Sequence, residues 1–97
     1  MDYKYRILHI NSKERWIHID SNDEWDRYEP DAFVHFVKKI RDETEGTIEN
    51  VGDCQYIINY EGPQFIYQWD DLFGIVVIYP ENITEDDAVG FLSKYLS

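Results

Sequence analysis

The residue types in this sequence that best suit zinc binding or thiol chemistry are three histidines and one cysteine: His9, His18, His35 and Cys54. A four-ligand zinc site would consume all of them, and neither C-x-x-C nor H-x₃₋₅-H spacing occurs. Nucleophilic catalysis requires a base held beside the thiol, and no pattern places one there. Because alternating apolar residues follow Cys54, we expect it to open a strand as a buried, chemically quiet side chain. We expect no metal and no cofactor.

Acidic residues offer two further candidate sites. The segment Asp20–Asp31 begins like a calcium loop, but Trp25 stands where the loop geometry needs glycine, and the last position is aspartate in place of the longer glutamate. Asp70 and Asp71 could pair for acid–base chemistry, but aspartates also favour turns by bonding their own backbone. No glycine-rich phosphate loop, G-x-S-x-G or H-E-x-x-H motif occurs. We therefore expect Asp20–Asp31 to be a solvated linker and Asp70 and Asp71 to lie in a turn. We expect no enzymatic activity.

The net charge of −11 is distributed unevenly along the chain. Residues 1–41 contain eight acids and eight bases, whereas residues 42–97 contain twelve acids and a single base, Lys94. This imbalance argues against binding to nucleic acid or to anionic membranes, which require basic patches. It favours either solubility alone or a positively charged protein partner. No apolar run approaches the roughly 20 residues that cross a bilayer, and a lone cysteine gives no sign of an oxidising compartment, so we expect a cytoplasmic protein.

The densest apolar stretch predicts two neighbouring strands. In the segment Gln64–Trp69, aromatic residues alternate with glutamine and isoleucine, which is typical of a strand with one drier face. The segment Ile75–Tyr79 is continuous and rich in β-branched residues, which favours a central strand covered on both faces. Between them, Gly74 can supply a positive φ to the turn.

The first part of the chain predicts a hairpin. Alternating segments flank a polar turn of four residues that starts at Asn11. That turn would place His9 opposite Trp16 and Ile7 opposite His18.

Apolar spacing predicts two helices. The first begins near Pro30, ends near Gly46 and has an apolar stripe at i, i+1, i+3, i+4 and i+7 that comprises Phe33, Val34, Phe36, Val37 and Ile40. The second begins after Thr84, whose hydroxyl suits the N-cap position and is followed three residues later by an acid. Each helix has one apolar face, so both should cover a sheet.

The remaining strand completes the predicted fold. Cys54–Tyr60 alternates, and a tight turn at Glu61–Pro63 should pair it antiparallel with the segment that follows. The order is strand, strand, helix, three strands and helix. We therefore predict one α+β domain over residues 1–97, a two-layer sandwich whose mainly antiparallel, five-stranded sheet is covered by two helices.

Aromatic residues beside acidic loops predict a binding surface. Tyrosine and tryptophan are over-represented at binding hot spots, because they bury much area at little cost in side-chain entropy. The turn after Tyr60 and the loop after Trp69 flank one strand only ~20 Å long, so one partner can reach both loops. We therefore predict that a basic partner contacts five residues: Tyr60, Glu61, Trp69, Asp70 and Asp71.

The profile as a whole is small, acidic, rich in aromatic residues and without a catalytic motif. It resembles that of bacterial immunity proteins that neutralise nuclease toxins, including barstar-like inhibitors, although the resemblance is one of composition and not of a shared motif. The resemblance implies a non-catalytic inhibitor that binds a basic, nuclease-like toxin, because carboxylates can occupy the phosphate positions of a basic cleft. A phage-type nucleic-acid mimic would use the same physics. A structural or regulatory module whose acidity serves only solubility is the other alternative.

Overall fold

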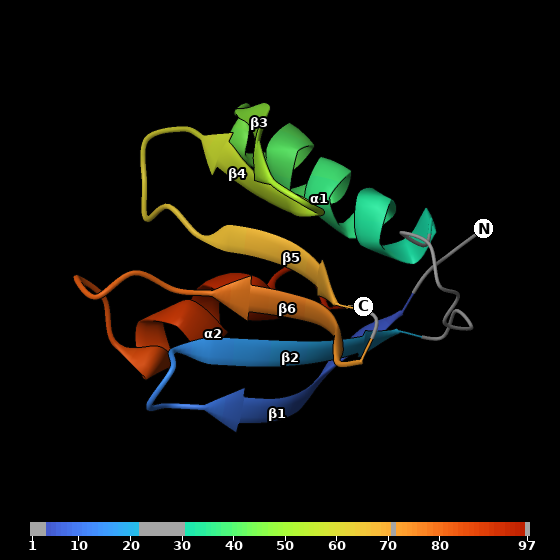
Figure 1. Ribbon diagram of the computed structural model, residues 1–97. Coiled ribbons are helices and arrows are strands. Elements are labelled where there is room, and N and C mark those ends of the chain that lie inside the picture. Colours follow the sequence, from blue (N-terminus) through green and yellow to red (C-terminus); the bar gives the residue numbers. More distant parts are fainter. Residues whose placement is uncertain (1–3, 22–30, 71, 97) are drawn as a thin grey trace.

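The computed structural model describes residues 4–21, 31–70 and 72–96. These residues form two layers, in which an antiparallel sheet of six strands carries two helices on one of its faces (Figure 1). Neither helix is long and apolar enough to span a membrane. The elements in chain order are β1 (Tyr5–Asn11), β2 (Trp16–Ser21), α1 (Asp31–Thr44), β3 (Thr47–Gly52), β4 (Gln55–Asn59), β5 (Ile66–Asp70), β6 (Gly74–Ile78) and α2 (Glu85–Ser93).

The strand order in the sheet is β1-β2-β6-β5-β4-β3, and every neighbouring pair is antiparallel. β6 therefore inserts between the first hairpin and the later strands, as expected for a central strand. The expected cover on both faces is wrong, because the two helices lie on one face of the sheet. The predicted total of five strands is wrong, because β3 is a sixth strand at the edge of the sheet. Its sequence offers only Ile48 and Val51 as apolar residues, so the strand depends on backbone pairing with β4 more than on its own pattern.

The core lies between the sheet and the two helices. Alternation in β5 sends Tyr67 and Trp69 under α1, where they lie near Phe36 and Phe33 respectively. The predicted apolar stripe of α1 is confirmed for its four buried members, which are Phe33, Phe36, Val37 and Ile40. In α2, Leu92 is likewise buried. The expected α+β fold with two helices on an antiparallel sheet is confirmed at this level.

The ends of the helices show one confirmed cap and one correction. Thr84 is the N-cap of α2, and its Oγ1 accepts a hydrogen bond from the backbone N–H of Asp87 at 3.1 Å. At the end of α1, the residue with a left-handed backbone is Glu45, with φ 56°. Gly46 follows it and serves a different purpose, since an added Cβ would lie 2.6 Å from Cγ2 of Ile58.

The register of the first hairpin differs from the prediction by two residues at His9 and by one residue at Ile7. His9 pairs with His18, and Ile7 pairs with Ile19. The reason is that Asn11 still belongs to β1, opposite Trp16, so the turn begins one residue later than expected. A bulge between Ile7 and His9 then offsets the pairing further along.

Two local predictions about β4 are also wrong. Cys54 does not open the strand; it is half-buried in the turn after β3, with φ 52°. The connection from β4 to β5 is longer than a tight turn, because β4 ends at Asn59 and β5 begins at Ile66. Within this connection the Tyr60 hydroxyl donates a hydrogen bond to the carbonyl of Pro63 at 2.6 Å. This bond links the first residue of the loop to its middle.

Candidate protein-binding surface

The predicted contact residues lie at the two ends of β5. Glu61 is exposed and Tyr60 is half-buried, with its ring stacked at 6.1 Å from that of Phe91. At the other end, Oδ1 of Asp70 accepts backbone N–H groups of Leu72 at 2.8 Å and Phe73 at 3.2 Å. Asp70 therefore stabilises its own turn, whatever else it contacts. The fifth predicted position, residue 71, lies outside the described residues.

Trp69 does not join these residues at the surface. Its side chain is 7% exposed and lies under α1, with its ring centroid 6.4 Å from that of Phe33. The period of two along β5 sends Trp69 and Asp70 to opposite faces of the sheet. The predicted role of Trp69 as an exposed anchor is therefore wrong, and the tryptophan belongs to the core.

The face of the sheet opposite the helices offers a different apolar surface. In the part of the chain that the structure describes, neither helix covers this face, which we call the open face (Figure 1). A single line of Cα partners crosses it from β4 to β2, through Ile57, Ile66, Ile78 and Trp16, and we call these four residues the apolar row. All four side chains are half-buried, because they shield one another across the strands.

The open face has a further apolar residue on the β3 side and an ion pair at its rim. Val51, beside the bulge of β3, is 45% exposed and lines a shallow depression together with three residues of the row. Arg15 and Glu81 also line the depression and form an ion pair at 3.2 Å. The carboxylate of Glu49 adds charge at one end of the row, because Glu49 is exposed and pairs with Ile57.

A second line of partners runs parallel to the apolar row and contains two adjacent histidines. His18 is the Cα partner of both Val76 and His9. Its ring lies 5.6 Å from that of His9 and 5.3 Å from that of Phe73, and its Nε2 has no hydrogen-bond partner among the described residues. Burial and the neighbouring His9 lower the pKa of His18, while the nearby carboxylate of Asp70 opposes them more weakly. His18 is therefore neutral at pH 7.

Sequence reasoning missed the apolar row, and little in the sequence could have revealed it. Ile57, Ile66 and Ile78 resemble core residues when each strand is considered alone. Their exposure depends on which face of the sheet the helices occupy, and their alignment depends on the strand order. The only available signal was the alternation around Ile66, which placed its side chain on the opposite face of the strand from the aromatic residues.

Neither a metal site nor a similar known protein assigns a function to this surface. Across residues 4–21, 31–70 and 72–96, no group of three or more histidine, cysteine, aspartate or glutamate side chains could hold a metal ion. The segment Asp20–Asp31, which begins like a calcium loop and which we expect to be a solvated linker, falls largely on residues 22–30, which lie outside the described ranges. We found no family model, no curated protein and no solved structure that matches this chain.

Proposed function

We propose that this protein is a non-catalytic inhibitor that binds a basic protein partner, in the manner of an immunity protein that neutralises a nuclease-like toxin. The single observation that carries the proposal is the apolar row on the open face. An antiparallel sheet with one covered face normally presents polar side chains on the other. Contiguous apolar residues on such a face are typical of an interaction site.

The dimensions of the open face favour a protein as the partner. Three steps between strands make the apolar row roughly 14 Å long. The whole face, at about 4.8 Å between strands and 3.3 Å per residue, covers roughly 400 Å². A standard protein interface takes about 800 Å² from each partner. The partner must therefore also contact the edge of the sheet and the loops around the face, where charged residues such as Glu49 of β3 and Glu81 lie.

The charge of the chain favours a basic partner over a second copy of the same protein. Two copies would each bring a net charge of −11 to the interface and would repel one another. A basic partner would instead be attracted, and its association rate would fall as salt screens the charges. The apolar row would then hold the complex once formed, because desolvated apolar contacts act mainly on the dissociation rate.

The experiment compares two isoleucine substitutions in binding to a basic partner. Candidate partners come from two sources: any toxin-like reading frame found next to the gene, and basic proteins captured on the immobilised protein. We expect Ile66→Gln to weaken binding by at least about fivefold, since it removes the centre of the row. Ile83→Gln is the matched control, because Ile83 is also half-buried but packs against the core. Equal effects of the two substitutions, or binding that does not respond to salt, would contradict the proposal.

A further inference from the structure

β3 forms one edge of the sheet and pairs with β4 alone (Figure 1). Among the described residues, no other segment donates or accepts a backbone hydrogen bond along its outer side. An edge strand of this kind presents unpaired N–H and C=O groups, which are the template that an added strand uses. A bulge between Asn50 and Gly52 interrupts the pairing near the end of β3, so the regular stretch of the edge is Thr47–Asn50. The backbone of this stretch can pair with an extended segment of another protein.

Acidic residues around β3 select the charge of that segment. Glu45 precedes the strand, Glu49 lies within it and Asp53 follows it, and all three are exposed. Within the described ranges none of the three forms an ion pair, and the chain carries no lysine or arginine between Asp42 and Asp70. Basic side chains on an added strand would therefore meet carboxylates that no neighbouring base neutralises.

Alternation along β3 assigns the two faces of an added strand to different contacts. Glu49 pairs with Ile57 of the apolar row, so its side chain belongs to the open face. Ile48 pairs with Ile58 and packs against the core, so its side chain belongs to the face that carries the helices. Residues directly opposite one another on neighbouring strands share a face. The added strand would therefore place a basic residue opposite Glu49 and a different residue type opposite Ile48.

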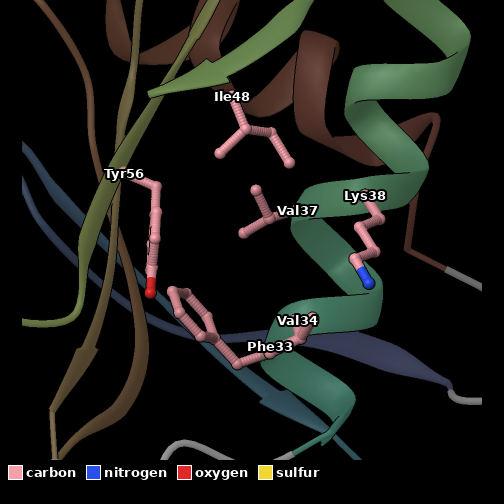
Figure 2. A pocket seen from close by; sticks show the side chains of 6 residues that line it. All are labelled: Phe33, Val34, Val37, Lys38, Ile48 and Tyr56. Atoms are coloured by element: carbon pink, nitrogen blue, oxygen red, sulfur yellow. The ribbon is translucent and has the colours of Figure 1, made fainter. Parts of the chain in front are cut away.

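A half-open apolar depression beside β3 selects that second residue type. It lies between α1 and the strands β3 and β4, and Ile48 forms part of its wall. Figure 2 shows the side chain of Ile48 pointing toward Val37 of α1 across this depression. Phe33, Val34 and Tyr56 supply further apolar lining. An aliphatic side chain opposite Ile48 would bury apolar surface against these residues, which favours binding.

The opposite edge of the sheet does not suit the same segment. Residues 4–21, which include β1, β2 and the turn between them, carry four bases and two acids, so this hairpin has a net positive charge. The side chain of Arg6 on β1 is 74% exposed and would repel a basic segment. The bulge of β1 lies between Ile7 and His9, in the middle of the strand, which shortens any regular pairing there. A basic segment would therefore select β3.

We propose that β3 accepts an extended segment of a partner protein as a further strand, and that basic residues alternate with aliphatic residues in this segment. The basic residues face Glu49 on the open face, and the aliphatic residues face Ile48 and the depression. This inference goes beyond the proposed function and does not rest on it, because a strand added to β3 needs neither the apolar row nor an enzyme to inhibit.

The test uses the capped hexapeptide KVKVKV, with isotope-labelled protein observed by amide NMR. We expect saturable shifts that centre on Thr47–Asn50, together with slower hydrogen exchange of amides in β3. Two matched peptides separate pattern from composition and charge. KKKVVV keeps the composition without the alternation, and EVEVEV keeps the alternation with the opposite charge. Each should bind at least about fivefold more weakly than KVKVKV.

N-methylated peptides separate strand pairing from simple charge attraction. Successive residues of a strand direct their N–H groups to opposite edges, so methylation of all valines blocks one edge and methylation of all lysines blocks the other. At least one of these two peptides should lose binding, because one edge of the peptide must pair with β3.

Two substitutions in the protein test the place of the basic residues. Glu49→Gln should weaken binding of KVKVKV about two- to fivefold, as expected for the loss of an exposed ion pair. Glu81→Gln removes another exposed acid and should leave binding unchanged, because Glu81 lies outside β3. Shifts that centre on β1 or on the acidic loops, equal binding of KKKVVV, unchanged binding of both methylated peptides, or absence of binding at millimolar peptide would overturn the proposal.

Discussion

His9 and His18 face one another across β1 and β2, with ring centroids 5.6 Å apart and their planes nearly perpendicular. His18 is 8% exposed and its pKa is lowered, chiefly by burial and then by His9, so the folded protein disfavours the imidazolium form. The unfolded chain binds this proton near pH 6.5. As the pH falls below that value, the unfolded state gains protons first and folding becomes less stable.

We therefore expect the free energy of unfolding to decrease between about pH 7 and pH 5.5, above the range in which carboxylates titrate. His18→Phe should reduce this dependence, and His9→Asn should reduce it in part by removing the charge repulsion. Urea denaturation at several pH values measures it. A pH dependence that is unchanged in both variants would show that neither histidine is responsible.

Thr84→Ala should destabilise the domain by about 1 kcal/mol. The hydroxyl of Thr84 accepts the N–H of Asp87, and alanine would leave this helix donor without its partner. Denaturant midpoints measure the effect, with Thr84→Ser as a control that retains the hydroxyl. A loss of equal size in the serine variant would assign the effect to packing of the methyl group.

Glu45→Gly should stabilise the protein by roughly 0.5–1 kcal/mol, because Glu45 has a φ of 56° and glycine adopts this backbone conformation without strain. The matched control is Glu43→Gly within α1, where glycine should cost about 1 kcal/mol relative to a good helix former. Thermal denaturation of the three proteins compares them. A destabilised Glu45→Gly protein would contradict the left-handed conformation at the end of α1.

Two substitutions at Asp70 separate its turn role from any role in binding. Asp70→Asn retains an oxygen that can accept the N–H groups of Leu72 and Phe73, so stability should be nearly unchanged. Asp70→Ala removes that oxygen and should cost about 1 kcal/mol. If Asp70 also attracts a basic partner, Asp70→Asn should slow association and reduce its salt dependence. Equal stabilities of the alanine and asparagine variants would show that the turn does not depend on this side chain.

Local features of the chain were predictable because their causes are local. The alternation before Trp69 and the β-branched run before Tyr79 identified two strands. The spacing of apolar residues identified the first helix, and Thr84 marked the start of the second. In each case, the physical cause acts within one turn of helix or one pair of neighbouring residues, so the sequence alone contains it.

The position of β3 and the turns were less predictable. A strand whose only apolar residues are Ile48 and Val51 depends on its partner β4, and a pairing partner is a tertiary property. The turn after Asn11 shifted by one residue because Arg15 can take a φ of 59°, which residue type alone does not forecast.

The candidate binding surface was decided almost entirely by the tertiary structure. The sequence determined that Trp69 and Ile66 point to opposite faces of their strand, because side chains alternate along β-strands. It did not determine which face the helices would cover. It also could not show that β6 would insert between β2 and β5, which places Ile78 between Ile66 and Trp16. Strand order depends on contacts between residues far apart in the chain, and those contacts form only when the whole sheet assembles.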